Sequence, residues 1–422
     1  MPPIFTTPSQ SINDTAVRIP GSKSYTHRVL IAAALANGPS TLSNALESED
    51  TQLTMKALQQ MGVSMDVRST CIEVQGLGGC FRSCERPIYL GNSGTSMRLL
   101  ISIAALGKGA YTLTGTDRMQ ERPVQALIDS LTQIGVPVQS VHQNGCPPLI
   151  VTGSAVKGGS LGIDCSISSQ FLSSLLLMAP LTQEGLAIDV LKGPVSRPYV
   201  DLTVDIMRRF GVTLQRQGYD HFDVPGEQTY RPGAYEVESD VSNASYFWAA
   251  GAISGKTIKV KGISGESLQG DVGILSLFEK MGCTVTVHPD GIAVSGGRLR
   301  AIEADMADMP DMVPTMAVVA AFAEGTTRIR NVAHLRAKEC DRLDAVMQEL
   351  KAMGIETRST GDDLSIVGGQ PKAAEIETYN DHRIAMSFAV AGLQAPGTRI
   401  RNPECVEKSF PTFWEVYGSL FE

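Results

Sequence analysis

A helical pattern that ends in a hydrophobic residue, a glycine and another hydrophobic residue occurs five times along this 422-residue chain. Its glycines are Gly62, Gly135, Gly211, Gly282 and Gly354, which gives spacings of 73, 76, 71 and 72 residues. A glycine just after the last helical turn suits a left-handed backbone conformation that a Cβ atom would penalise. A repeat at this regular spacing predicts that the chain folds as a series of similar α/β units.

A second kind of helical segment alternates with the first. It is rich in alanine and other apolar residues, and it runs into a glycine turn followed by a β-prone stretch. The six turn glycines are Gly38, Gly109, Gly185, Gly255, Gly325 and Gly397. A helix that is apolar on most of its faces is expected to be buried. The pattern therefore predicts six α/β units, with the apolar helices inside and the sheets outside them.

The six units divide into two groups of three. The segment 225–233 is rich in proline and glycine and approaches the expected boundary. We expect a first lobe of residues 1–20 and 239–422, and a second lobe of residues 21–238. The expected fold class is α/β, with two similar domains that are each an inside-out barrel of three repeated units.

Composition and charge argue against several classes of protein. The formal net charge is −8 and the chain has no run of lysine or arginine, which is unfavourable for nucleic-acid binding. The longest apolar-rich run, residues 171–181, is shorter than the ~20 residues of a membrane span. The first residues lack the pattern of a signal peptide. We expect a cytoplasmic protein that binds neither nucleic acid nor membrane.

Metal and nucleoside triphosphate sites are not expected either. Cys80 and Cys84 form a close pair, but there is no second pair and no histidine at metal-ligand spacing. The segment 20–24 resembles the end of a phosphate-binding loop, yet Ser22 stands where that loop requires a glycine before the lysine. We therefore expect free thiols and no nucleoside triphosphatase activity.

The starts of the apolar helices carry the main functional signal. Small polar residues that can cap a helix stand there, accompanied by Lys23, Arg28, Arg98 and Arg383. The free N–H groups and the positive end of the helix dipole already attract anions. Added cations are unfavourable at that end unless an anion binds. Several such ends brought together would form a site for a small molecule with several negative charges.

Basic residues also recur at the starts of the other helices. Arg122, Arg197, Lys338 and Arg342 occupy corresponding places in the repeat. The planar guanidinium of arginine suits a carboxylate or a phosphate, whereas lysine acts as a point charge. The recurrence favours a role in anion binding over four unrelated surface charges.

Eight motifs stand in order along nearly the whole chain, from Arg18 to Phe413. They comprise residues 21–24 with 28, 90–95 with 98, 121–123, 168–171, 196–199, 338–343, 380–383 and 408–411. Together they resemble the motifs of the 5-enolpyruvylshikimate-3-phosphate (EPSP) synthase family. No single motif is decisive, but eight in sequence are very specific.

The resemblance implies a reaction and a fold. The reaction is transfer of the carboxyvinyl group of phosphoenolpyruvate to the 5-hydroxyl of shikimate 3-phosphate, with release of phosphate, in the shikimate pathway of aromatic amino acid biosynthesis. The fold is a two-domain arrangement of six repeated units that closes on its substrates. The resemblance implies no metal ion and no organic cofactor, and we expect a monomer.

The resemblance also implies roles for individual residues. Those implied to hold shikimate 3-phosphate are Lys23, Ser24, Arg28, Ser168, Ser169, Gln170, Ser196, Tyr199, Asp311, His334 and Lys338. Those implied to hold phosphoenolpyruvate are Lys23, Asn92, Gly94, Arg122, Gln170, Glu339, Arg342, His382, Arg383 and Lys408. Asp311 would accept the proton of the 5-hydroxyl, and Glu339 would exchange a proton with the methylene carbon. Lys23 and His382 would act near the reacting phosphate.

Some positions depart from the family pattern. His334 stands where an asparagine commonly contacts the shikimate side, and Cys340 replaces a usual serine or threonine. We interpret Cys340 as a small buried residue rather than a nucleophile.

Two alternative functions are weighed against this one. A sister enolpyruvyl transferase acts on UDP-N-acetylglucosamine, but it relies on a loop cysteine that is missing between Gly107 and Arg122. A non-catalytic anion-binding protein could share the fold. Asp311 and Glu339 argue against it, because extra carboxylates do not help to bind anions.

Overall fold

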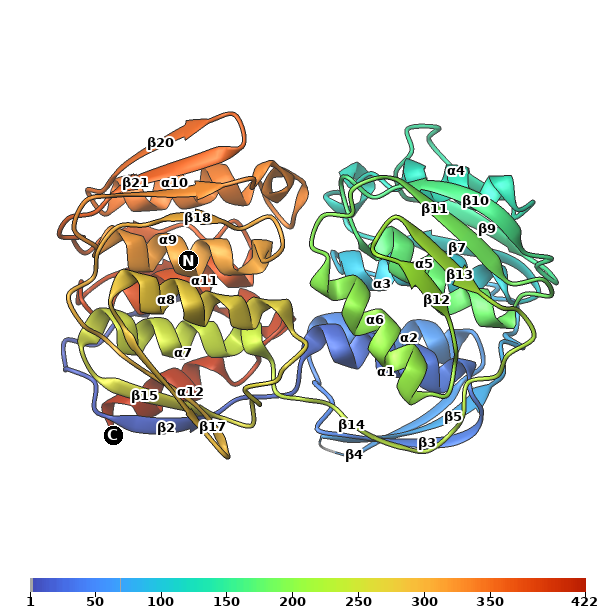
Figure 1. Cartoon of the computed structure of the whole chain (residues 1–422), viewed down its shortest axis with the longest axis horizontal. Helices are drawn as coiled ribbons and strands as arrows, with labels where there is room; N and C mark the ends of the chain where they lie inside the picture. Colours follow the sequence, from blue (N-terminus) through green and yellow to red (C-terminus); the bar gives the residue numbers. More distant parts are fainter. Residues whose placement is uncertain (1–2, 69) are drawn as a thin grey trace. The chain divides into compact units, whose positions relative to one another are not determined.

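The computed structural model describes residues 3–68 and 70–422, so the first two residues of the expected first lobe lie outside the described residues. The chain forms two units. Unit 1 comprises Met1–Pro20 and Glu238–Glu422, and unit 2 comprises Gly21–Val237. In Figure 1, unit 2 runs from blue to green and most of unit 1 from yellow to red. Each unit has its own hydrophobic core.

Unit 2 contains α1 to α6 and β3 to β14. The helices are α1 (Lys23–Leu35), α2 (Glu49–Gln60), α3 (Gly94–Ala105), α4 (Gln125–Gln133), α5 (Gln170–Met178) and α6 (Pro198–Arg209). The strands are β3 (Asn37–Ser43), β4 (Ser64–Arg68), β5 (Cys71–Leu77), β6 (Ile88–Tyr89), β7 (Gly109–Thr114), β8 (Val138–Ser140), β9 (Leu149–Gly153), β10 (Gly159–Asp164), β11 (Leu186–Lys192), β12 (Gln215–Gln217), β13 (His221–Val224) and β14 (Ala234–Glu236).

Unit 1 contains the first two strands and the remaining elements. The helices are α7 (Val241–Ser254), α8 (Ile274–Met281), α9 (Val313–Ala321), α10 (Arg342–Ala352), α11 (His382–Ala391) and α12 (Phe413–Gly418). The strands are β1 (Ile4–Thr6), β2 (Thr15–Arg18), β15 (Thr257–Lys261), β16 (Thr284–His288), β17 (Gly291–Ser295), β18 (Glu303–Asp305), β19 (Thr326–Arg330), β20 (Glu356–Thr360), β21 (Asp363–Val367), β22 (Glu375–Ile376) and β23 (Arg399–Arg401).

The sheets share one pairing pattern. Unit 2 has the strand orders β14-β3-β5-β4, β6-β7-β9-β8 and β10-β11-β13-β12, and unit 1 has β2-β15-β17-β16, β18-β19-β21-β20 and the shorter β22-β23-β1. In each order the first pair is parallel and the following pairs are antiparallel. The expected α/β class is confirmed, and each glycine repeat corresponds to one such sheet.

The alternation of side chains explains how each sheet covers the core. β3 pairs with β5 in a register that runs from Asn37↔Leu77 to Leu42↔Ile72. Alternate residues of β5 are buried and the others reach outward. A strand places successive side chains on opposite faces, so one face of this sheet packs on the core and the other does not.

The alanine-rich helices are buried, as the sequence predicts. Every residue of α9 and α11 is buried, and α1, α3, α5 and α7 are buried along nearly their whole length. In unit 1, α7, α9 and α11 pack against one another. The other helices are amphipathic: α2, for example, buries six of its twelve residues. No helix in residues 3–68 and 70–422 is long and apolar enough to cross a membrane.

The repeat glycines have the backbone conformation that their position predicts. All five that follow amphipathic helices have a positive φ, between 76° and 104°. A residue with a Cβ atom rarely adopts this conformation. The glycine therefore ends each helix and turns the chain toward the next strand.

Close packing of the buried helices generates a stability prediction. A Cβ atom added to Gly251 in α7 would lie 2.4 Å from the carbonyl oxygen of Val294 in β17, whereas one added to Gly418 in α12 meets no atom within 4 Å. We expect Gly251→Ala to lower the free energy of unfolding by about 1–3 kcal/mol, because backbone atoms must move. Gly418→Ala should leave stability unchanged or raise it slightly, because alanine favours the helix. Chemical denaturation measures both, and equal effects would contradict the packing argument.

Candidate active site

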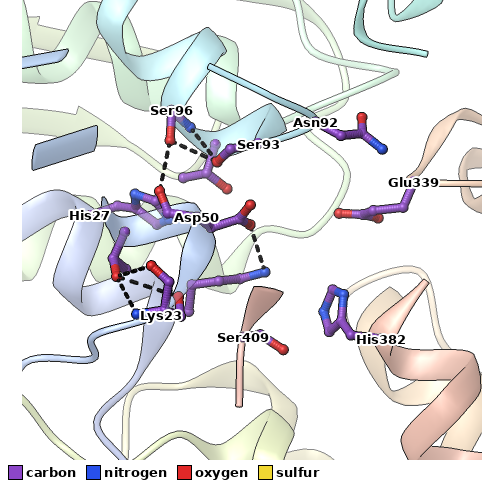
Figure 2. A network of polar contacts seen from close by, with 12 residues as sticks. Lys23, His27, Asp50, Asn92, Ser93, Ser96, Glu339, His382 and Ser409 are labelled. Carbon is purple, nitrogen blue, oxygen red and sulfur yellow. Dashed lines mark hydrogen bonds and ion pairs between the residues drawn. The ribbon is translucent and has the colours of Figure 1, made fainter. Parts of the chain in front are cut away.

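Helix α1 of unit 2 begins at Lys23, at the point where a buried polar cluster forms. Ser22 caps the helix, and its Oγ accepts a hydrogen bond from the Tyr25 amide. Lys23 Nζ lies 3.3 Å from Asp50 Oδ2, and both side chains are nearly buried. Figure 2 shows this ion pair. A buried ammonium needs such a partner, since the cost of removing it from water is otherwise large.

The start of α3 holds a guanidinium against the helix end. Arg122 Nη1 donates to the backbone oxygen and to the Oδ1 of Asn92, at 3.1 and 3.2 Å. A Cβ atom on Gly94 would lie 2.5 Å from Arg122 Nη2, so only glycine leaves room for this arginine. The guanidinium of Arg122 therefore lies next to the free backbone amides at the start of α3. That combination is well suited to bind an anion.

A chain of buried hydroxyls supports this helix start. Ser93 caps α3, and its Oγ lies 2.7 Å from Ser96 Oγ. Ser96 Oγ in turn lies 2.7 Å from Thr54 Oγ1, which is 2.8 Å from His27 Nδ1. Ser96 also donates to the backbone oxygen of Asp50 at 3.3 Å (Figure 2). The starts of α1, α2 and α3 are thus held together by one polar network.

The start of α5 is attached to α3 through Gln170. Its Nε2 donates to Thr95 Oγ1 and its Oε1 accepts from Arg98 Nη1, both at 2.9 Å. Ser168 and Ser169 precede it and are buried. Ser196 lies just before α6 with a positive φ of 56°, and Tyr199 lies in the first turn of that helix.

Arg28 is one of the fully buried residues among those predicted. Its side chain is fully buried and donates to Thr203 Oγ1 at 2.8 Å, to Ser173 Oγ at 3.4 Å and to the oxygens of Tyr199 and Ser24. Burial lowers its pKa to about 10, against a raising effect of Tyr199 and Tyr25, so the group still carries its charge at neutral pH. Arg28 therefore ties α1 to α5 and α6.

In unit 1, Arg342 is the centre of a second polar network. It begins α10 and is 1% exposed. Its Nε donates to Asp381 Oδ2 at 2.7 Å, its Nη1 to Asp311 Oδ1 at 2.8 Å and its Nη2 to Glu339 Oε2 at 2.6 Å. Burial acts to lower the pKa of Arg342, but the three carboxylates raise it well above its usual value.

Arg383, at the start of α11, completes this network. Its Nη2 donates to Asp311 Oδ2 at 2.7 Å, and its Nη1 donates to the Tyr246 hydroxyl at 3.4 Å. Its backbone amide donates to Asp381 Oδ1, which makes Asp381 the N-cap of α11. The structure thus brings Asp311, Glu339, Arg342 and Arg383 into direct contact.

The charge state of Asp311 follows from these neighbours. Burial alone would raise its pKa, but Arg383, Arg342 and Lys338 hold the pKa well below its usual range. Asp311 is therefore ionised at neutral pH. It is a weak proton acceptor as long as both guanidinium groups face it.

The remaining predicted residues of unit 1 lie close to this network in sequence or in space. His382 is fully buried next to Asp381, with Nδ1 3.8 Å from Oδ1. His334 lies in the 3-10 helix η5 (Ala333–Ala337), and burial followed by the charge of Lys338 lowers its pKa to about 4. It is therefore neutral at pH 7. Lys408 ends the 3-10 helix η6 (Pro403–Lys408) and is 6% exposed.

Cys340 fits the interpretation of a small packed residue. Its Sγ–H donates to Asp381 Oδ2 at 3.6 Å, and burial followed by the Asp381 carboxylate raises its pKa. A protonated thiol is a poor nucleophile.

Sequence reasoning missed several residues of these networks. Asp50, Thr54 and Ser96 were not among the candidates, and neither was Asp381 as an ion-pair partner. The sequence did contain a signal for Asp50: it stands in the first turn of an amphipathic helix. Lys338 and Arg342 were chosen as candidates because they stand near the start of another such helix. The buried hydroxyls gave no signal, since serine and threonine are common near helix starts for capping alone.

The overall fold matches that of a known group-transfer enzyme. The enolpyruvyl transferase NikO from Streptomyces tendae superimposes with a TM-score of 0.80, over 99% of this chain and 97% of that one, at 20% identity. An EPSP synthase from Acinetobacter baumannii gives a TM-score of 0.83 at 29% identity, over 98% and 97% of the two chains. The architecture is thus that of an enolpyruvyl transferase.

Sequence comparison is more specific. The family model for EPSP synthase (3-phosphoshikimate 1-carboxyvinyltransferase) matches residues 7–417. The 3-phosphoshikimate 1-carboxyvinyltransferase of Syntrophobacter fumaroxidans is 44% identical over 95% of this chain and 96% of its own length. That of Sulfurovum sp. is 43% identical over 96% of both. The chain belongs to the EPSP synthase family, and the resemblance seen in the motifs is confirmed.

The buried pair of Asp381 and Arg342 generates a stability prediction. We expect Asp381→Asn to lower the free energy of unfolding by about 3–5 kcal/mol, because it removes one charge of a fully buried pair. Asparagine can still accept the Arg383 amide as an N-cap, so the loss reports on the pairing with Arg342 rather than on capping. The control is Glu324→Gln, whose partner Arg298 is 72% exposed, and it should have little effect. Urea denaturation measures both, and a similar loss in the control would disprove the special role of the buried pair.

Proposed function

We propose that the chain transfers the carboxyvinyl group of phosphoenolpyruvate to the 5-hydroxyl of shikimate 3-phosphate and releases inorganic phosphate. The observation that carries the proposal is the network of unit 1, in which Asp311 and Glu339 share the guanidinium of Arg342. Two carboxylates for proton transfer beside cations for anionic substrates are what this reaction needs. Membership of the EPSP synthase family supports the same assignment.

The reaction can be written with named proton carriers. A new bond forms between the 5-oxygen and C2 of phosphoenolpyruvate, while Asp311 takes the hydroxyl proton. Glu339, which must enter this step protonated, gives its proton to the methylene carbon. Glu339 then takes a proton back from that methyl group as the C–O bond to phosphate breaks. The proton that Asp311 took passes to the released phosphate, which returns Asp311 to its ionised form. The net change is one new ether and one free phosphate, so no metal ion or organic cofactor is required.

Substrate binding would make Asp311 a stronger base. The carboxylate and phosphate of phosphoenolpyruvate compete for Arg342 and Arg383. A guanidinium that turns toward the substrate holds Asp311 less firmly, and the proton affinity of Asp311 then rises. The base would thus become effective when the anionic substrate is in place.

Residues of both units are proposed to serve this one reaction. In unit 2, Arg122, Asn92 and Gly94 would hold phosphoenolpyruvate with Lys23 and Gln170. Ser168, Ser169, Ser196, Tyr199, Ser24 and Arg28 would hold shikimate 3-phosphate. In unit 1, Lys338 and His334 would serve shikimate 3-phosphate, and Lys408 and His382 would serve phosphoenolpyruvate.

Three finer features are proposed together with this function. Each unit would be an inside-out α/β barrel, a proposal supported by the burial of α7, α9 and α11 along nearly their whole length. The lobes would comprise residues 1–20 with 239–422, and residues 21–238. The enzyme would act as a monomer in the cytoplasm.

A phosphate-release assay tests the function. Purified protein is incubated with phosphoenolpyruvate and either shikimate 3-phosphate, UDP-N-acetylglucosamine or no acceptor, and NMR identifies the vinyl ether. We expect phosphate release with shikimate 3-phosphate alone. Release with UDP-N-acetylglucosamine would assign the sister reaction instead. The absence of release with either acceptor would favour a protein that only binds anions.

Replacement of the proposed base should affect turnover more than binding. We expect Asp311→Asn to lower kcat by at least about 10²-fold, because positioned acid–base groups contribute roughly that much. KM for each substrate should change only a few-fold, since asparagine keeps the shape of the side chain and its oxygen can still accept a hydrogen bond from one of the two arginines. Asp363→Asn, on β21 of the same unit, is the control. A kcat in Asp311→Asn within threefold of the control would exclude Asp311 as the base.

The tight contact at Gly94 predicts a selective loss of affinity. Gly94→Ala places a Cβ atom 2.5 Å from Arg122 Nη2, so the guanidinium must leave the start of α3. We expect KM for phosphoenolpyruvate to rise about tenfold, equivalent to ~1.4 kcal/mol, which is near the value of one charge-assisted hydrogen bond. KM for shikimate 3-phosphate should stay within twofold.

The control for this variant is Gly233→Ala, also in unit 2, where the added Cβ atom would be at an ordinary 3.5 Å from Tyr235. Steady-state kinetics measure both constants. Equal losses for the two substrates in Gly94→Ala would show that Arg122 does not serve phosphoenolpyruvate in particular.

A further inference from the structure

Unit 1 contains a buried carboxyl group that the proposed mechanism does not use. Asp271 lies in the 3-10 helix η3 (Gly270–Gly273) and is 5% exposed. Ser242 Oγ donates to its Oδ2 at 2.5 Å. No motif of the sequence singled out Asp271 for chemistry. A carboxyl group that is buried at such cost to its charged form requires a physical reason.

Helix α7 connects Asp271 to the Asp311 network. Ser242 lies in the first turn of α7, and one turn later the Tyr246 hydroxyl accepts a hydrogen bond from Arg383. Arg383 in turn holds Asp311 at 2.7 Å. Residues four apart on a helix lie on the same face. One face of α7 therefore contacts Asp271 through Ser242, and contacts Arg383, the partner of Asp311, through Tyr246.

The segments that hold the two carboxyl groups are also neighbours. α7 packs against η3 and against η4 (Pro310–Met312), which contains Asp311. A Cβ atom on Gly273, at the end of η3, would lie 2.7 Å from Met309 Cε, just before η4. The segments that contain Asp271 and Asp311 thus adjoin one another.

The two carboxyl groups respond to this region in opposite ways. Burial, followed by the charge of Asp311, raises the pKa of Asp271 to about 6, while Ser242 and Arg383 act in the lowering direction. Asp311 has the two arginines beside it and a pKa well below its usual range. Such a pair titrates as a unit, and the charge of one member sets the affinity of the other for a proton.

We propose that Asp271 is a positioning residue for the reaction, whose carboxyl charge sets the proton affinity of Asp311. When Asp271 is ionised, its negative charge makes Asp311 a stronger base. When Asp271 is neutral, Asp311 is a weaker base and turnover is slower. This inference rests on the function proposed above and adds an ionisable group that does not touch the substrate.

Other ionisable groups lie near Asp271. Asp240 caps α7, Tyr246 lies on the same helix, and Arg383 is on α11. Glu279 and Lys280, on the adjoining helix α8, are exposed. Burial raises the pKa of Tyr246, so its hydroxyl stays neutral. The experiment must therefore measure how the charge of Asp271 affects the proton affinity of Asp311.

The pH dependence of kcat tests the inference. Both substrates carry phosphates that titrate near pH 6, so the ratio of wild-type kcat to Asp271→Asn kcat is measured, which cancels their contribution. We expect the ratio to rise from about 1 at pH 5 to about three to ten at pH 7.5, because only the wild type gains the second negative charge. A ratio that is constant with pH would overturn the inference.

Two further variants make this readout specific. Ser242→Ala removes a hydrogen bond that favours ionised Asp271, so its kcat should rise at a higher pH than that of the wild type. Glu349→Gln removes another buried carboxyl group of unit 1, which accepts from Tyr379 at 2.7 Å, and its pH profile should match the wild type. A Glu349→Gln profile that changes as Asp271→Asn does would mean that any buried carboxyl has this effect and would overturn the proposal.

An activity-independent measurement separates this inference from the proposed function. An aspartate whose pKa is higher in the folded state makes the protein less stable as the pH rises. The loss occurs between its pKa in the unfolded chain, near 4, and its pKa in the folded protein, near 6. The free energy of unfolding of Asp271→Asn, relative to that of the wild type, should therefore increase between about pH 4 and about pH 6 and stay constant above about pH 6. A constant difference would overturn the inference. Wild type that is inactive with shikimate 3-phosphate would overturn the proposed function, whereas active wild type with a flat kcat ratio would overturn only the role of Asp271.

Discussion

The guanidinium of Arg342 is the interaction on which the geometry of unit 1 depends. It is buried, and it binds carboxylates from three separate segments: Asp381 at the start of α11, Asp311 in η4, and Glu339 just before α10. None of these acids could be buried alone without a large loss of solvation. The planar fork of arginine satisfies all three at once. Removal of this one charge would take a positive partner from each of the three carboxylates.

The buried helices explain why such a network can exist at all. α7, α9 and α11 fill the interior of unit 1 with apolar side chains, so their first turns are the places where polar groups meet. Asp240 and Asp381 cap two of these helices, and Ser242 and Arg383 each stand two residues later. The same arrangement recurs in unit 2, where Ser22 and Ser93 cap α1 and α3 beside Lys23 and Arg122. A repeated fold thus repeats its polar helix starts.

Local features of the fold could be predicted from the sequence, whereas pairs of residues that are far apart in the chain could not. The glycine spacing located the repeats because a left-handed turn after a helix has few alternatives to glycine. Capping residues located the helix starts for a similar reason. In contrast, the pairing of Lys23 with Asp50, or of Asp271 with Ser242, joins residues that are more than 25 positions apart. No local rule specifies such a pair, because it depends on how separate segments pack. Arg28 illustrates the same limit: its motif indicated an anion ligand, whereas its internal contacts extend across α1, α5 and α6.

The presence of carboxylates in a site proposed for anions follows from the need to keep arginines ordered. Asp311, Glu339 and Asp381 accept hydrogen bonds from Arg342 and Arg383, and these contacts hold the guanidinium groups in place. In the reaction proposed above, a substrate carboxylate or phosphate would displace one of these internal partners. The displaced carboxylate then loses a positive neighbour and gains proton affinity at the moment when a proton has to be moved. Binding and base activation are, on this reasoning, one exchange of partners. A second buried carboxyl group, that of Asp271, would raise the proton affinity of Asp311 further, because it adds negative charge that the arginines no longer offset.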